Sequence, residues 1–260
     1  MSYRTIEITK EGPAAIVLLN RPEKRNAINF DMMHELEDGL AALNADTDVS
    51  GVIITGGDSV FSAGVDLNTA KELGSPRKFT DYMSHWRRLN KSLEEHNKPI
   101  IAAIEGYCFT GGLEFALACD LRIASKGASF AITSSKIGTV AGAGGTQRLP
   151  RIIGLSNALE MMFSADPFDA DYAYRVGLIN KLVANGQALS EAKKLASLYA
   201  SRAPLSLRFV KRAVYAGMQM PLAEAIEFEG FMVNTIYNTS DKLEGITSFL
   251  EKRPAKFRGE

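Results

Sequence analysis

The sequence predicts an α/β fold, in which buried parallel or mixed strands alternate with helices. Three features of the 260 residues point to this class. Short runs rich in β-branched residues alternate with helical patterns through the first two-thirds of the chain, and only helical patterns follow from about residue 187. One short motif also occurs twice, each time after a predicted strand. Strands separated by helices need crossover connections, which favours buried parallel strands.

The predicted strands are short apolar runs bounded by Gly, Pro or Asn. The N-terminal segment MSYRTIEITKEG (1–12) begins as a strand with alternating apolar and polar residues. The buried runs are AAIVLL (14–19), GVIIT (51–55), IIAAI (100–104), LRIAS (121–125), ASFAI (128–132) and GLINKLV (177–183). Between them, DMMHELEDGLAAL (31–43) and SHWRRLNKSLEEH (84–96) have apolar residues at helical spacing.

The C-terminal quarter is predicted to form four successive helices. Pro204 and Pro221 stand where the first turn of a helix tolerates proline. We therefore expect two regions, a body over residues 1–186 that holds the functional site and a helical region over residues 187–260. We expect the helical region to cover the core, with the site it holds, or to mediate oligomerisation, although from the pattern alone it can equally complete the core of the monomer.

Composition excludes several functional classes. Lys plus Arg and Asp plus Glu both number 30, so no net charge favours nucleic acid or an anionic membrane surface as a partner. No apolar run approaches the roughly 20 residues of a membrane span, and no targeting pattern opens the chain, so we expect a cytoplasmic protein. Three scattered histidines, with Cys108 and Cys119 as the two cysteines, match no metal-binding spacing. We expect no metal and two buried, reduced cysteines.

The repeated motif suggests an oxyanion-binding device. FSAGVDL (61–67) and FTGGLEF (109–115) share Phe, a hydroxyl residue, a small residue, Gly, an aliphatic residue and an acid. Small residues let the backbone approach a ligand closely, and a helix start offers unpaired N–H groups. Two such helix starts can point at one oxygen and stabilise negative charge that develops on it.

Glu114 is the unusual residue of the second copy, because it opens a run that is otherwise apolar, FALA (115–118). An ionised carboxylate in such a place costs several kcal/mol unless it is stabilised. Beside an oxyanion site in an apolar pocket, it is a candidate general base. It can equally cap the first turn of its own helix, near the positive end of the dipole. Spacing alone does not separate these interpretations.

Six segments together carry a resemblance to a known family. They are NRPEKRNAI (20–28), VFSAGVDLNTA (60–70), KPIIAAIEGYCFTGGLEFALACDLRIAS (98–125), KIGTVAGAGGTQRLPRIIG (136–154), YRVGLINKLV (174–183) and EGITSFLEKRPAKFRG (244–259). In this order they resemble the enoyl-CoA hydratase/isomerase (crotonase) family over nearly the whole chain. The resemblance implies a crotonase-like spiral of ββα units with a helical C-terminal region, and homotrimers or dimers of trimers. It also implies acyl-CoA thioester substrates, so coenzyme A would arrive as part of the substrate without a permanently bound cofactor.

The resemblance also assigns the catalytic groups. The oxyanion hole falls on the backbone N–H groups of Val65 and Gly111, which agrees with the repeated motif, and Glu114 falls on the first of two catalytic glutamates. The second glutamate belongs twenty residues later, where this chain has Ser134 within FAITSSKIG. Glu114 would therefore be the single acid/base carboxylate. Ser134 would hold a water or a substrate group, or hydrogen-bond only to the local backbone.

Residues that contact coenzyme A follow from the same resemblance. Lys24, Arg25 and Ala27 belong to the segment that resembles the CoA-binding loop, although without the surrounding motif they would indicate only a solvated turn after Pro22. A further set, along the pantetheine and thioester path, comprises Ala63, Asp66 and Leu67. The last set resembles C-terminal residues that contact the nucleotide end of CoA on a neighbouring subunit, and comprises Lys256 and Phe257.

The missing second carboxylate leaves the reaction open. One base suffices to move a double bond. Hydration needs water to be activated toward Cβ and a proton to be delivered to Cα, so a single base must serve both steps or an ordered water must assist. The alternatives are a specialised crotonase, such as an alicyclic dienoyl-CoA hydratase or a β-oxo acyl-CoA hydrolase, and a degenerate member that binds acyl-CoA without useful catalysis. No GxSxG elbow supports a serine hydrolase.

Two further stretches bear on the acyl site. FTDYMSHWRRL (79–89) places Phe79, Tyr82, Met83 and Trp86 at helical spacing, which suits core packing or a wall of an acyl pocket. GTVAGAGGTQRL (138–149) lacks the ending of a P-loop and is interpreted as backbone packed closely beside the active site.

Overall fold

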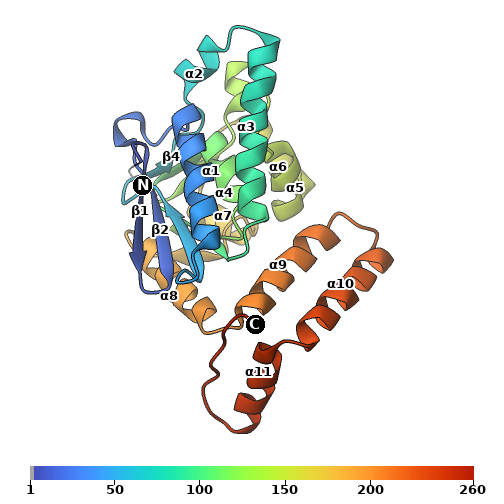
Figure 1. Ribbon diagram of the computed structural model, residues 1–260. Helices are drawn as coiled ribbons and strands as arrows, with labels where there is room; N and C mark the ends of the chain where they lie inside the picture. Colours follow the sequence, from blue (N-terminus) through green and yellow to red (C-terminus); the bar gives the residue numbers. More distant parts are fainter. Residues whose placement is uncertain (1–2) are drawn as a thin grey trace.

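Two β-sheets form the body of the protein in the computed structural model, which describes residues 3–260 (Figure 1). The larger sheet has the strand order β1-β2-β3-β5-β7-β10. β1 runs antiparallel to β2, and all other neighbours in this sheet are parallel. Its strands are β1 (Ile6–Glu11), β2 (Ala14–Leu19), β3 (Gly51–Thr55), β5 (Ile100–Ile104), β7 (Leu121–Ser125) and β10 (Lys181–Val183).

The smaller sheet supplies the second strand of each ββα unit. Its order is β4-β6-β8-β9, with strands β4 (Val60–Ser62), β6 (Tyr107–Phe109), β8 (Ser129–Ala131) and β9 (Phe168–Asp169). A large-sheet strand, a small-sheet strand and a helix follow one another three times along the chain. The helices are α2 (Leu67–Glu72), α4 (Gly111–Leu117) and, after the 3-10 helix η2 (Ser134–Ile137), α5 (Gly145–Ile153). The predicted spiral of ββα units is confirmed.

Most predicted strands and helices are observed. The runs at 14–19, 51–55, 100–104 and 121–125 have the bounds predicted, whereas only the last three residues of 177–183 pair as β10. The structure adds β4 and β6, which are three residues long and therefore too short to show a period in the sequence. Residues 1 and 2, included in the predicted first strand, lie outside the described residues.

Alternation along the central strands gives the large sheet two covered faces. Val52 and Ile54 of β3 belong to the core beneath α1 (Phe30–Ala45) and α3 (Pro76–Glu94). Ile53, which lies between these two residues in the strand, faces the opposite side of the sheet and packs against alanines of α8 (Ala188–Ala200). Burial on both sides explains why these strands are continuous apolar runs.

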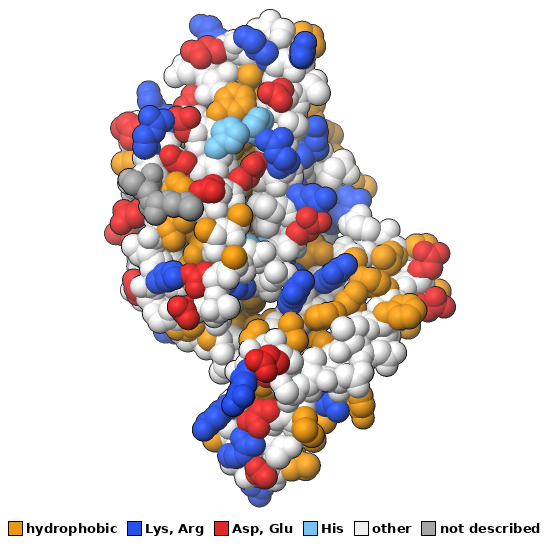
Figure 2. Space-filling model, in the orientation of Figure 1, with side chains coloured by type: hydrophobic (Ala, Val, Ile, Leu, Met, Phe, Trp, Pro, Cys, Tyr) orange, Lys and Arg blue, Asp and Glu red, His pale blue; other side chains and the backbone are white. Residues whose placement is uncertain are grey.

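Three helices at the C-terminus form an arm that projects from the body (Figure 1). The arm consists of α9 (Pro204–Gly217), α10 (Leu222–Tyr237) and α11 (Ser240–Leu250). Lys211 and Tyr215 of α9 anchor it, since Lys211 Nζ lies 2.9 Å from Asp120 Oδ2 and the Tyr215 hydroxyl donates to Asp120 Oδ1 at 3.1 Å. α9 and α10 have no fully buried residue, and Figure 2 shows apolar side chains along the arm. α8, the first helix of the predicted C-terminal region, packs on the large sheet and is not part of the arm. The division expected at residue 187 stays a prediction.

The remaining helices, α6 (Leu155–Ser164) and α7 (Ala170–Arg175), lie between the last ββα unit and β10. Cys108 and Cys119 are buried and unpaired, as predicted. Within residues 3–260, no helix combines the length and apolar character needed to cross a membrane.

Candidate active site

A cavity of about 410 Å³ lies at the start of α2 and α4, with α3 along one side. Its volume is typical of sites for small molecules. The cavity brings together most of the residues that the sequence predicted. They are Lys24, Ala27, Ala63, Val65, Asp66, Leu67, Glu114 and Ser134.

Glu114 is buried in this cavity, with 2% of its surface exposed. Its Oε1 accepts a hydrogen bond from the backbone N–H of Gly145, at the start of α5, at 2.8 Å. Burial raises the pKa of the Glu114 carboxyl above its ordinary value, while the N–H groups of Gly145 and Ala143 and the charge of Arg148 oppose this shift. The carboxylate is thus supported by the next ββα unit, and the structure shows no bond from it to the N–H groups of its own helix among residues 3–260.

Gly145 has to be glycine for this contact to form. A Cβ at this position would lie 2.9 Å from both Cγ and Oε1 of Glu114, closer than side-chain carbons approach other atoms. The stretch at 138–149 therefore packs its backbone against the candidate catalytic carboxylate, as the sequence predicted. Arg148 of the same helix pairs with Glu94 at 2.6 Å, which fixes α5 to the end of α3.

Two backbone N–H groups beside Glu114 have no acceptor within residues 3–260. In the β-bridge between Val65 and Ile28, the Ile28 N–H donates to the Gly64 carbonyl and the Asp66 N–H donates to the Ile28 carbonyl. The bridge therefore leaves the N–H of Val65 unpaired. Gly111 is the first residue of α4, where an N–H has no partner inside the helix. The two groups are adjacent, because a Cβ on Gly111 would lie 3.1 Å from the Val65 nitrogen.

Thr110 holds the backbone in front of Gly111 in a strained conformation that the sequence did not reveal. Its φ of 42° and ψ of −113° are unfavourable for a β-branched residue and cost about 1–3 kcal/mol. Two contacts hold it there: Thr110 N donates to the Ala131 carbonyl at 2.7 Å, and its Oγ1 lies 2.7 Å from Oγ1 of Thr133. Thr110 aligns with Ser62 in the repeated motif, and this shared hydroxyl was the signal in the sequence that could have indicated a role for Thr110. The Ser62 hydroxyl donates to the Asn26 carbonyl at 2.8 Å and accepts from the Gly64 N–H at 3.1 Å.

The predicted CoA loop divides at Arg25. Lys24 and Ala27 line the cavity, whereas Arg25 has a φ of 50°, is exposed and does not line it. The Arg25 carbonyl accepts from the N–H of Ala63 at 2.9 Å, which ties the loop to the first copy of the repeated motif. Asp66 lines the cavity but also caps α2 and pairs with Arg21 at 3.0 Å.

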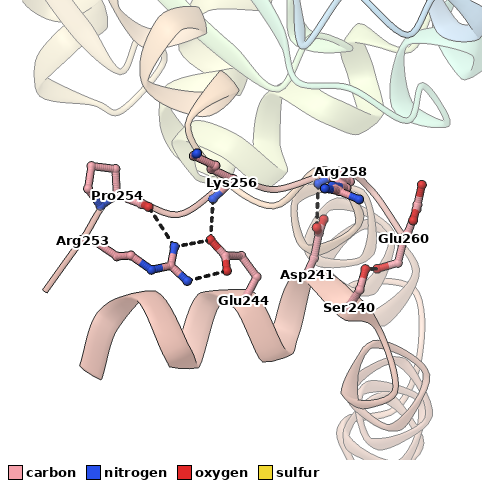
Figure 3. A pocket seen from close by; sticks show the side chains of 8 residues that line it. All are labelled: Ser240, Asp241, Glu244, Arg253, Pro254, Lys256, Arg258 and Glu260. Carbon is pink, nitrogen blue, oxygen red and sulfur yellow. Dashed lines mark hydrogen bonds and ion pairs between the residues drawn. The ribbon is translucent and has the colours of Figure 1, made fainter. Parts of the chain in front are cut away.

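Lys256 and Phe257 do not line this cavity within one chain. They follow α11 in the arm, where Glu244 accepts from Arg253 at 2.7 Å and from the backbone N–H of Lys256 at 2.8 Å (Figure 3). The Lys256 side chain lines a separate depression on the arm. The contact expected with CoA on a neighbouring subunit stays a prediction.

Ser134 starts η2 and is buried against the cavity, with 4% of its surface exposed. Its hydroxyl has no hydrogen-bond partner among residues 3–260, so the backbone bond left open by the sequence does not form. The hydroxyl remains available to a water or a ligand.

The aromatic stripe on α3 serves both expected purposes. Phe79, Tyr82, Met83 and Trp86 all line the cavity, and Tyr82 and Trp86 are also buried in the core. The indole of Trp86 packs beside Gly111, since its Cη2 would lie 3.3 Å from a Cβ there. Over the described part of the chain, no group of three His, Cys, Asp or Glu side chains is placed to hold a metal ion.

The chain is similar to known proteins over nearly its whole length. The chain matches the family model described as enoyl-CoA hydratase/isomerase over residues 9–260. It is 38% identical over 258 residues to a crotonyl-CoA hydratase of Syntrophomonas wolfei, covering 99% of both chains. It is 36% identical over 256 residues to a short-chain-enoyl-CoA hydratase of Clostridium acetobutylicum, covering 97% of both.

Solved structures show the same fold. A crystal structure of an enoyl-CoA hydratase from Bacillus anthracis superposes with a TM-score of 0.95 at 32% identity, covering 99% of this chain and 100% of that one. The structure of DspI from Pseudomonas aeruginosa gives a TM-score of 0.95 at 31% identity, covering 99% of this chain and 98% of that one.

Proposed function

The chain belongs to the enoyl-CoA hydratase/isomerase family, and from this premise we propose that it acts on short-chain enoyl-CoA thioesters with Glu114 as its single acid/base carboxylate. One observation carries the proposal: a buried carboxylate and two adjacent, unpaired N–H groups line or border the same cavity. A thioester carbonyl that accepts from Val65 and Gly111 would gain stabilisation as it becomes an enolate.

The simplest reaction for this site is a shift of a double bond. Glu114 takes a proton from Cα of a 3-enoyl thioester, and the electron pair of that C–H bond forms a dienolate whose negative charge rests on the thioester oxygen. The protonated Glu114 then returns the proton to Cγ, which leaves the double bond between Cα and Cβ. The pKa of Glu114, raised by burial, suits a group that must both take and return a proton.

Hydration is the second reaction, and the names of the curated relatives favour it. Here Glu114 takes a proton from water while the water oxygen bonds to Cβ, and then delivers that proton to Cα of the enolate. Ser134, whose hydroxyl has no protein partner within residues 3–260, would hold this water in place of the missing carboxylate. Ser134 cannot itself replace the carboxylate, because a neutral hydroxyl is a poor acid near pH 7.

The test is to incubate the protein with crotonyl-CoA and, separately, with a 3-enoyl-CoA, following product mass and enoyl absorbance. A gain of one water from crotonyl-CoA supports hydration, and Ser134→Ala should then lower its rate. Conversion of the 3-enoyl to the 2-enoyl ester without hydration supports the isomerase. If both esters bind and neither reacts, the specialised or non-catalytic alternatives replace this proposal.

We also propose assembly into a homotrimer or a dimer of trimers, with Lys256 and Phe257 contacting the nucleotide end of CoA on a neighbouring subunit. The exposed apolar side chains of the arm support assembly, and examples are Val210, Leu222, Phe231 and Phe249. The position of Lys256 outside its own chain's cavity supports the contact in trans. Light scattering should give three or six times the 28.3 kDa of one chain, and a monomer mass would contradict the proposal.

A further inference from the structure

Asp66 adds a second carboxylate to the cavity that holds Glu114. Both line the cavity, and Asp66 follows directly after Val65, whose backbone N–H is one of the two proposed oxyanion donors. The charge of Asp66 acts across the cavity, because burial raises the pKa of Tyr82 to about 12 and the charges of Asp66 and Glu114 add to the rise. A negative charge one residue from an oxyanion donor opposes an enolate, so the site needs a positive charge beside Asp66.

Arg21 supplies that charge from behind the wall of the cavity. Its Nη2 lies 3.0 Å from Asp66 Oδ2, with 14% of the Arg21 side chain and 10% of the Asp66 side chain exposed. A pair shielded from water in this way is screened much less by salt than an exposed one. Among residues 3–260 no second Lys, Arg or His side chain pairs with Asp66, although Lys24 also lines the cavity. The charge balance beside Val65 therefore depends on one guanidinium.

The same guanidinium also holds the segment that resembles the CoA-binding loop. Arg21 Nη1 donates to the carbonyl of Ala27, a residue that lines the cavity, at 2.5 Å. Two backbone bonds join the next residue to the segment before α2, since the Ile28 N–H donates to Gly64 at 2.7 Å and the Asp66 N–H donates to Ile28 at 3.0 Å. One side chain thus bridges the loop and the start of α2.

The ion pair can be separated from the other role of Asp66, which is to cap α2. Oδ1 of Asp66 accepts from the N–H groups of Asn68 at 3.1 Å and Thr69 at 3.4 Å, which leaves Oδ2 for Arg21. An asparagine oxygen caps a helix about as well as an aspartate oxygen. Asp66→Asn therefore removes the charge and keeps the cap.

We propose that Arg21 is a positioning residue of the active site, which neutralises Asp66 beside an oxyanion donor and orients the CoA-binding loop through Ala27. This inference rests on the proposed function, because it assumes that a thioester enolate forms next to Val65. The two contacts of Arg21 act on different constants. The ion pair acts on the enolate and hence on kcat, whereas the bond to Ala27 acts on binding of the ester.

A double-mutant cycle on Arg21 and Asp66 tests the inference, with kcat on crotonyl-CoA or a 3-enoyl-CoA and calorimetric affinity for butyryl-CoA as readouts. Arg21→Met leaves Asp66 charged and unpaired, so kcat should fall about 10–100-fold. Loss of the bond to Ala27 should lower the affinity about threefold to tenfold. In Arg21→Met/Asp66→Asn, kcat should return to within about threefold of the Asp66→Asn value because no charge is left uncompensated, while the affinity stays low.

Recovery of kcat in the double variant is a result that a merely structural role does not produce. Two independent losses of structure add, so kcat would then be as low as in Arg21→Met or lower, and the inference would be overturned. All variants are measured well below their melting temperatures. Arg21→Lys provides a second test, because lysine keeps the charge without the planar fork that reaches two acceptors. It should lose affinity as Arg21→Met does, with kcat lowered by less than about threefold; a larger fall in kcat would contradict the electrostatic role.

Lys181→Met is the matched control. Lys181 Nζ lies 2.7 Å from Glu191 Oε1 in a partly shielded pair outside the cavity, so kcat and ester affinity should match those of the unmodified protein. If the unmodified protein neither binds butyryl-CoA nor converts either enoyl ester, the proposed function fails and this inference fails with it. An active protein in which the double variant shows no recovery refutes only the role of Arg21.

Discussion

Glu114→Gln should lower kcat on enoyl-CoA esters by about 10²–10⁴-fold while the esters still bind. Glutamine has nearly the shape of glutamate, and its amide oxygen can still accept from the Gly145 N–H that now lies 2.8 Å from Oε1. It cannot take up and return a proton. Steady-state kinetics together with calorimetric binding of a saturated acyl-CoA separate the lost proton transfer from lost binding.

Glu105→Gln is the appropriate control for this variant. Glu105 is also buried, with 6% of its surface exposed, but it accepts from the Ala188 N–H at the start of α8 and lies outside the cavity. Its replacement should leave kcat within about threefold. Full activity of Glu114→Gln would refute the assignment of the base, and equal losses in both variants would indicate a general effect of replacing buried glutamates.

The same substitution should change the pH dependence of both activity and stability. Because burial raises the pKa of Glu114, the acidic limb of kcat/KM should fall at a pH above the usual value of a glutamate, and Glu114→Gln should lack that limb. A raised folded-state pKa means that the native protein binds more protons, so stability decreases as pH rises from the unfolded to the folded pKa. Above that window the ionised carboxylate opposes folding. Glu114→Gln should therefore melt at a higher temperature than the unmodified protein at neutral pH.

The sequence predicted the large sheet well because its strands are buried on both faces. A continuous apolar run such as GVIIT (51–55) needs no long period to be recognised, and Gly or Pro marks its ends. The three-residue strands β4 and β6 carry no comparable signal. They form because the repeated motif pairs with its neighbour in the next unit, as when Phe61 donates to the Glu105 carbonyl at 2.9 Å.

The sequence predicted those parts of the candidate site that depend on the local backbone of a motif. It did not predict contacts between residues that are far apart in the sequence. Gly111 is the first residue of α4 and Val65 lies two residues before α2, and small residues in a motif predict both positions. The contact between Gly145 and Glu114 joins residues 31 apart. The sequence predicted that residues 138–149 pack beside the active site, but not this hydrogen bond. The stripe containing Tyr82 and Trp86 was ambiguous, because one helical period serves both a core and a cavity wall. In the structure the stripe serves as both.

Gly111→Ala should lower kcat/KM by about 10²–10³-fold, the loss expected when an oxyanion hole cannot engage its oxygen. A backbone N–H cannot be deleted by substitution, but the space in front of it can be filled. The added methyl would lie 2.9 Å from Val65 Cγ2 and 3.1 Å from the Val65 nitrogen, where the thioester oxygen has to approach both N–H groups. Gly230→Ala on α10 has open space around its Cβ and is the control, with activity expected to be unchanged.

The two variants should differ in which constant they change, and this difference tests the division of roles. Glu114→Gln removes proton transfer alone, so the loss falls on kcat. Gly111→Ala removes contacts that the carbonyl makes in the bound substrate and strengthens in the enolate, so ester binding and kcat both weaken. A Gly111→Ala protein that melts normally yet retains full kcat/KM would place the oxyanion site elsewhere. If Gly111→Ala lowered kcat but left the ester affinity unchanged, the two N–H groups would engage the oxygen only in the transition state.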